Sequence, residues 1–233
     1  MKVSKRIKEI QKNVKINKEY SLEDAIKTLK QSSKVKFTES LDCDIRLGVD
    51  PKYADQMVRG TVSLPHGTGK EVRVLVVTKG PKAEEALQAG ADYAGFEEYL
   101  EKIKGGWTDI DVIIATPDSM GELGKLGRIL GPRGLMPNPK TGTVTTEVST
   151  AVKEVKAGKI DFRVDKTGIV HTSLGKLSFP EEHLIDNIKE FLRTIIKLKP
   201  SSAKGTYVKS LYLTSTMGPG LQIAKDEVFV SIK

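Results

Sequence analysis

Val72-Arg73-Val74-Leu75-Val76-Val77, residues 72–77, is the stretch that decides the fold of this chain. A continuous apolar run of this length is typical of a strand buried on both faces of a parallel sheet. A second such run follows at Val112-Ile113-Ile114-Ala115, and segments with helical periodicity lie between the two and after them. This alternation of strand and helix extends over about 90 residues and predicts a small open α/β domain.

The helices expected in this middle region begin near prolines or end near glycines. Pro81 and Pro117 each stand at the start of a periodic segment. A loop that is rich in Gly and Pro follows at residues 131–142. The expected helices cover residues 81–87, 96–104, 117–130 and 146–156.

The two flanks of this region have a different pattern. An amphipathic basic helix is expected over residues 3–14, and a second helix over residues 21–32, with Ser21 and Asp24 at capping-box spacing. The other expected elements are a strand at 41–49, an antiparallel hairpin of 160–164 with 169–172, a helix at 180–199, and strands at 207–215 and 221–232. Neither flank is complete alone. Together they predict one discontinuous, two-layer α+β domain with an antiparallel sheet, into which the α/β unit is inserted.

The distribution of charge agrees with this division. Residues 1–67 hold 14 Lys and Arg against 9 Asp and Glu, and residues 159–233 hold 12 against 8. Residues 68–158 hold 12 against 13. A basic surface attracts a polyanionic partner, because phosphates that are neutralised by Lys and Arg release counterions. We therefore predict a basic domain from residues 1–67 and 159–233, and a near-neutral inserted domain from residues 68–158.

Both connections between these domains carry glycine. The first connection contains Gly67 and Gly69, and the second contains Gly158. Because two chain segments with glycines can bend together, the sequence predicts a two-stranded hinge at these three residues.

Several classes of protein are excluded by composition. The one cysteine, Cys43, alternates with Leu41 and Ile45 as a buried strand residue would, and it has no partner for an internal disulfide, which favours a cytoplasmic location. With three histidines and one cysteine, no metal-ligand spacing appears, and no cofactor is expected. No apolar run reaches the ~18 residues that span a bilayer, so no membrane partner is expected.

No catalytic constellation emerges either. The segment Gly67-Thr68-Gly69-Lys70 resembles a phosphate-binding loop but fails its pattern, since Leu64 stands where a glycine is required and Glu71 where Ser or Thr is required. We therefore expect no enzyme. A nucleotide-binding protein that uses the central unit stays a rival interpretation, and a DNA-binding regulator is a third, although no helix-turn-helix signal supports it.

Two segments of the basic domain could contact RNA. The first segment, Lys36, Phe37 and Thr38, precedes a strand. In one interpretation it is an ordinary strand start with Phe37 in the core. In the other, its cation, ring and hydroxyl face RNA. Thr216-Met217-Gly218-Pro219-Gly220 holds more small residues than a hairpin needs, and such residues let an RNA backbone approach closely. On the expected hairpin, Arg163, Lys166 and His171 would add donors.

The segment Leu130-Gly131-Pro132-Arg133-Gly134-Leu135-Met136-Pro137-Asn138-Pro139-Lys140-Thr141-Gly142 resembles the signature of the large-subunit ribosomal protein "L one" family, whose members form the mobile stalk beside the tRNA exit site. Residues 36–40 and 215–220 are similar to the two RNA-binding segments of that family. The resemblance covers essentially the whole chain, in the bacterial form.

The resemblance implies a discontinuous first domain and an inserted Rossmann-like, three-layer α/β domain. It implies a protein without enzymatic activity that binds large-subunit rRNA, assists release of deacylated tRNA from the exit site, and represses its own operon by binding the mRNA. Such a protein works on the cytoplasmic ribosome and is expected to be a monomer away from it. The RNA contacts that it implies are Lys36, Phe37, Thr38, Arg163, Lys166, His171, Ser215, Thr216, Met217 and Gly218.

Overall fold

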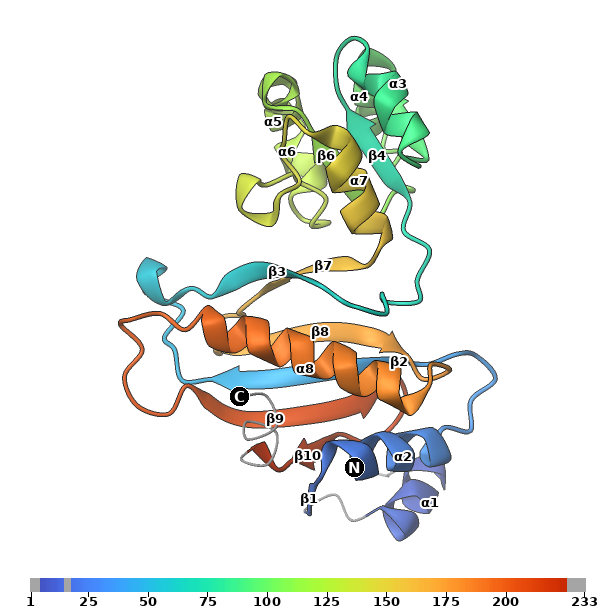
Figure 1. Ribbon diagram of the computed structural model, residues 1–233, viewed down its shortest axis with the longest axis vertical. Coiled ribbons are helices and arrows are strands. Elements are labelled where there is room, and N and C mark those ends of the chain that lie inside the picture. The colour runs from blue at the N-terminus through green and yellow to red at the C-terminus, as the bar shows by residue number, and fades with distance from the viewer. Residues whose placement is uncertain (1–4, 15–17, 226–233) are drawn as a thin grey trace. The chain divides into compact units, whose positions relative to one another are not determined.

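The computed structural model describes residues 5–14 and 18–225 and divides the chain into two compact units (Figure 1). The first unit consists of Met1–Gly69 and Ile160–Lys233, and the second of Lys70–Lys159. Both ends of the chain thus build one unit, and the middle segment builds the other. That these units are separate functional domains stays a prediction.

The first unit is built on a five-stranded sheet. Its strands are β1 (Glu19–Tyr20), β2 (Ser40–Leu47), β8 (Ile169–Lys176), β9 (Val208–Ser215) and β10 (Leu221–Ile223). Their spatial order is β1-β10-β9-β2-β8, in which β1 is parallel to β10 and the other neighbours are antiparallel. Strand β2, from the first chain segment, therefore lies between two strands from the last segment.

Helices cover one face of this sheet. They are α2 (Leu22–Ser32) and α8 (Glu181–Lys197), of which α8 lies along the sheet in Figure 1, and helix α1 (Lys5–Asn13) precedes them in the chain. The expected cap of α2 is present, since the Asp24 amide donates to the Ser21 Oγ at 3.2 Å. The apolar stripe of α8 is fully buried and consists of Leu184, Ile188, Phe191, Leu192 and Ile195.

The alternation of residues along β2 separates a covered face from an open face. Leu41, Cys43 and Ile45 are fully buried, which confirms the expected burial of Cys43. Successive side chains of a strand point to opposite faces, so the intervening residues Asp42 and Asp44 belong to the other face. The unit therefore has two layers, as predicted, and a polar sheet surface is left open.

The predicted hairpin of residues 160–164 with 169–172 is wrong beyond its turn. Strand β7 (Lys159–Arg163) pairs with β3 (Arg59–Ser63) in a separate two-stranded sheet, and β3 was not among the predicted strands. A single bridge joins Val164 to Val170. Beyond it the chains diverge, because the Phe162 ring packs edge-on against Phe191 of α8 with centroids 5.3 Å apart.

The last strand is also shorter than expected. Strand β10 ends at Ile223, whereas residues 221–232 were predicted to be extended. The remainder of that prediction, from residue 226 onward, lies outside the described residues.

The second unit is a three-layer α/β structure. Its parallel strands β4 (Val74–Val77), β5 (Tyr93–Gly95) and β6 (Val112–Ala115) lie in the order β5-β4-β6. Val74 and Val76 pack with residues of α3 (Lys82–Gln88) and α7 (Val148–Lys156) on one face. Leu75 and Val77 pack on the other face with residues of α4 (Glu97–Lys104), α5 (Met120–Lys125) and α6 (Gly127–Leu130). The predicted fold class is confirmed in both units.

The helix predicted over residues 117–130 is broken into short pieces. A 3₁₀ turn at Pro117–Ser119 leads into α5, and Leu126, with φ −91° and ψ 4°, separates α5 from α6. Three glycines in this stretch, Gly121, Gly124 and Gly127, lower its helix propensity, because each loses more backbone freedom than alanine would.

The connection that leaves the first unit is anchored to α8 by a buried asparagine. Asn187 is fully buried, and its Oδ1 accepts from the His66 amide at 3.1 Å. Its Nδ2 donates to the carbonyls of Gly67 and Leu174 at 3.0 and 2.8 Å. The His66 ring also stacks on His183 with centroids 3.8 Å apart. The segment that contains Gly67 is therefore part of the folded first unit.

Replacing Asn187 with Ala should destabilise the first unit by about 2–4 kcal/mol, because buried backbone groups lose their hydrogen-bond partners. Urea denaturation followed by circular dichroism would measure the free energy of unfolding. The control is Lys189→Ala on the same helix, where a change within about 0.5 kcal/mol is expected. Equal effects of the two substitutions would contradict the anchoring role.

Candidate nucleic-acid interface

The two predicted RNA-binding segments meet at one end of the first unit's sheet. Lys36, Phe37 and Thr38 lie just before β2, and Thr216 lies just after β9. The Ser40 amide donates to the Thr216 Oγ1 at 3.0 Å, and the Thr216 amide donates to the Ser40 carbonyl at 3.2 Å. Segments that are 176 residues apart in the chain are thus joined by reciprocal hydrogen bonds.

Glu39 holds the second of these segments in place, and the sequence analysis did not single it out. Its side chain is 2 % exposed. Its Oε1 accepts from the Met217 amide at 2.7 Å and from the Ser215 hydroxyl at 3.3 Å. A carboxylate can accept several hydrogen bonds at once, so one buried group fixes the backbone at the start of the loop. The sequence feature that could have indicated this role is the position of Glu39 as a lone acidic residue within a basic segment.

The packing of side chains inside this loop favours glycine at residue 218. Its amide donates to the Ser215 carbonyl at 3.0 Å, which closes a tight turn. A Cβ atom at Gly218 would lie 2.2 Å from the Ser215 Oγ, whereas a Cβ at Gly220 would meet nothing within 4 Å. The buried Ser215 side chain therefore shapes the loop from within, and Gly218 makes room for it.

The groups that this end of the sheet exposes combine charge, hydroxyl and apolar surface. Phe37 is 53 % exposed and Met217 is 44 % exposed, so the alternative in which Phe37 is a core residue is wrong. Lys36, Thr38 and Thr216 are exposed as well. We call Lys36, Phe37, Thr38, Thr216, Met217 and Gly218 the loop cluster. An exposed ring beside a cation and hydroxyls is a surface that suits an unstacked base and its phosphate.

Lys166 lies at the opposite end of the same sheet, and Arg163 is the last residue of β7 in the separate two-stranded sheet. The turn that contains Lys166 is attached to the end of β2 by a hydrogen bond from the Leu47 amide to the Gly168 carbonyl at 2.8 Å. From Ser40 to Leu47, β2 spans roughly 23 Å, at about 3.3 Å per residue. The structure therefore separates these two predicted contacts from the loop cluster.

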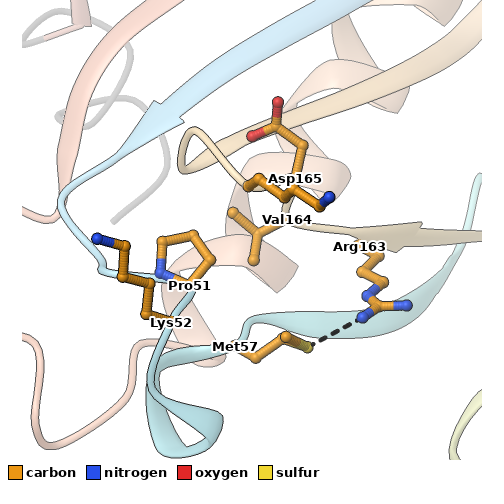
Figure 2. A pocket seen from close by; sticks show the side chains of 7 residues that line it. Pro51, Lys52, Met57, Arg163, Val164 and Asp165 are labelled. Atoms are coloured by element: carbon orange, nitrogen blue, oxygen red, sulfur yellow. Dashed lines mark hydrogen bonds between the residues drawn. The ribbon is translucent and has the colours of Figure 1, made fainter.

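This far end contains a cationic groove, which Figure 2 shows. Three basic side chains contribute to it, and the Arg163 guanidinium donates to the Met57 sulfur at 3.3 Å. Hydrogen bonds from the Thr167 hydroxyl and from the Ile169 amide hold the pKa of Asp165 below its usual range, so its charge stays negative at neutral pH. The groove is lined by Pro51, Lys52, Met57, Arg163, Val164, Asp165 and Lys166.

His171 lies between the two ends, on the open face of the sheet. It pairs with Asp44 in the register of β2 with β8, and the His171 Nδ1 is 2.6 Å from the Asp44 Oδ1. The side chain of His171 is 59 % exposed. The loop cluster and the turn that contains Lys166 thus lie at the two ends of one sheet, and His171 lies between them.

In the second unit, Lys70 of the phosphate-loop-like segment is bound to an acidic side chain. Its Nζ is 2.5 Å from the Asp111 Oδ1, and the Arg73 amide donates to the Asp111 Oδ2 at 3.1 Å. Burial alone would raise the pKa of Asp111, but these bonds from Lys70 and Arg73 lower it. Lys70 therefore has a structural partner, in agreement with the failed phosphate-loop pattern.

Comparison with known proteins identifies the family. Residues 29–219 match the "Ribosomal protein L1p/L10e family". The chain belongs to this family. It is 63 % identical over 222 residues to the large ribosomal subunit protein uL1 of Phocaeicola vulgatus, covering 95 % of this chain and 96 % of that protein. The proteins of the same name from Parabacteroides distasonis and Flavobacterium johnsoniae are 62 % identical over 210 residues and 60 % identical over 222 residues. These matches cover 90 % of both chains in the first case, and 95 % of this chain and 97 % of the relative in the second.

Family membership confirms the resemblance found in the signature segment. This is a ribosomal protein and not an enzyme, and its place is the cytoplasmic ribosome. Within residues 5–14 and 18–225, no helix is both long and apolar enough to cross a membrane. In that same part of the chain, no group of three His, Cys, Asp or Glu side chains could hold a metal ion.

Replacing Glu39 with Ala should lower the stability of the first unit by about 1–3 kcal/mol, since the Met217 amide is left without its acceptor. Glu39→Gln keeps a carbonyl acceptor and should recover most of that loss. Thermal unfolding of both variants checks this. Equal losses for Ala and Gln would show that the carboxylate charge, rather than the acceptor, fixes the loop.

Gly218→Ala should destabilise the first unit by about 1–3 kcal/mol, because its added methyl group overlaps the Ser215 hydroxyl. Gly220→Ala is the matched control, because a methyl group fits there without contact. The same urea titration should find the control within about 0.5 kcal/mol of the unsubstituted chain. A neutral Gly218→Ala would disprove the internal packing role of this glycine.

Proposed function

We propose that this chain is a structural protein of the large ribosomal subunit and that its first unit binds large-subunit rRNA. The observation that carries the proposal is the loop cluster, in which two distant segments are joined so that Phe37, Met217 and Lys36 are exposed together. Exposed apolar and aromatic side chains next to a cation are costly on a free surface and useful against splayed bases.

The affinity should have two separable parts. Lysines such as Lys36 attract phosphates in a salt-dependent manner that does not depend on RNA sequence. The loop at Thr216–Gly218 is held by Glu39 and Ser40, so its shape is set before RNA binds. A preorganised loop contributes recognition of RNA shape, since little conformational entropy is lost on binding.

We further propose the finer roles that the family resemblance implies. These are a place in the mobile stalk near the tRNA exit site, assistance to the release of deacylated tRNA, and repression of the chain's own operon through its mRNA. The loop cluster and the turn that contains Lys166 lie at opposite ends of β2, a strand roughly 23 Å long, and this supports two RNA contacts on one unit. An mRNA that imitates the rRNA target would compete for the loop cluster.

The proposed hinge at Gly67, Gly69 and Gly158 is refined by local contacts. All three have positive φ values, 65°, 67° and 104°, which glycine adopts without strain. The Gly67 carbonyl is bound by Asn187, and a Cβ at Gly69 would lie 2.8 Å from the Phe179 ring. Both residues are therefore held within the first unit, and we propose that bending begins after Gly69 and near Gly158.

Changing Lys36 to Ala should weaken binding to all RNAs and reduce the slope of log affinity against log salt by about 1, because one phosphate contact is lost. Thr216→Ala should weaken binding to the rRNA target several-fold, by about 1 kcal/mol, with the slope unchanged. Filter binding of an rRNA stalk transcript at four salt concentrations provides both quantities.

The control for Lys36→Ala is Lys27→Ala, which removes an exposed lysine from α2 on the covered side of the sheet. Its slope should equal that of the unsubstituted chain. If Lys27→Ala and Lys36→Ala lower the slope equally, the charge effect is general and the loop cluster is not the phosphate contact.

A further inference from the structure

The middle of the open sheet face is acidic, although both ends are basic. In the register of β2 with its neighbours, Asp42 lies opposite Ser173 and Thr214. Asp44 lies two residues further along the same strand, on the same face and roughly 7 Å away. Two carboxylates therefore lie on the open face, between the two ends of β2.

Both carboxylates interact with their cross-strand neighbours. The Asp44 Oδ1 is hydrogen-bonded to the His171 Nδ1 at 2.6 Å, and the Asp44 side chain is 33 % exposed. Burial raises the pKa of Asp42 and the charge of Asp44 raises it further, against opposing effects of Ser173 and Lys176. Asp42 is thus close enough to Asp44 for the negative charge of Asp44 to raise its pKa.

The other charged groups of this face lie around the acidic pair. Arg46 follows Asp44 on β2 and is exposed, toward the end that carries the cationic groove. Lys176 donates to the Ser40 Oγ at 2.8 Å, toward the loop cluster. His171 lies nearest to the middle of the face, and it carries a positive charge only when it is protonated. The sequence of charge along β2 is therefore basic, acidic and basic.

This arrangement of charge interacts differently with the phosphates of an RNA than with its riboses and bases. A phosphate that crossed the middle of the face would be repelled by two carboxylates, in addition to losing its hydration. A carboxylate oxygen instead accepts hydrogen bonds from 2′-hydroxyls and from base amino and imino groups. An RNA that spans the face must then turn its riboses or base edges toward β2.

We propose that Asp42 and Asp44 are specificity-determining residues, which accept hydrogen bonds from ribose or base donors and reject RNAs that bind by phosphate alone. This inference rests on the proposed binding of rRNA by the first unit. It assigns discrimination to the middle of the face, whereas affinity comes from the two basic ends.

The test compares the double variant Asp42→Asn/Asp44→Asn with the unsubstituted chain. Each binds an rRNA stalk transcript and, separately, poly(U), at matched salt. The variant should bind poly(U) about fivefold more tightly or better and the rRNA no more tightly than before, so that the preference for rRNA falls at least about fivefold. Circular dichroism of the variant verifies that the sheet is intact.

The control Glu23→Gln/Glu182→Gln removes two exposed acidic charges from α2 and α8, which cover the opposite face of the sheet. It changes net charge by the same amount and should leave the preference for rRNA unchanged. An equal loss of preference in the control, or an unchanged preference in the Asp42/Asp44 variant, overturns the inference while the proposed function stands. If the unsubstituted chain prefers poly(U) to rRNA, the proposed function fails and the inference fails with it.

Discussion

The pairing of β2 with strands on both sides is the constraint on which the first unit depends. Strand β2 comes from the first chain segment, and its neighbours β8 and β9 come from the last. Its apolar side chains Leu41, Cys43 and Ile45 are fully buried beneath the helices. The hydrogen bonds between the strands and this burial act together. The backbone groups of a central strand are all paired with its neighbours, and every second side chain lies in the core. The two chain ends therefore fold as a single body.

The same pairing creates the candidate interface. Where β2 begins, the chain before it meets the chain after β9, and buried Glu39 binds the Met217 amide. Where β2 ends, the Leu47 amide holds the turn that precedes β8. The ends of one strand thus position the loop cluster and the turn that contains Lys166. Asp42 and Asp44 lie on the open face between them.

Local patterns predicted the elements well, and long-range pairing was the weak point. Apolar runs and caps located β4, β6, α2 and α8 within a few residues, because burial and capping act over short distances in the chain. The predicted hairpin of residues 160–164 with 169–172 was wrong beyond its turn, since the contact of Phe162 with Phe191 is a tertiary contact that no local pattern predicts. Among the site residues, the exposure of Phe37 was undecided by the sequence, and the resemblance implied an RNA contact for Ser215, whose side chain is buried.

The order of residues was enough to predict the two classes of unit, the basic character of the chain ends and the family, because periodicity, charge and the signature segment are all read from that order. Only the tertiary structure decided which predicted contacts lie together. In that structure the segment of Lys36 lies beside Thr216, Lys166 lies at the far end of β2, Arg163 lies in a separate sheet, and Glu39 is buried. The physical reason is strand register: side chains at the two ends of one strand are separated by its length, which sequence spacing does not reveal.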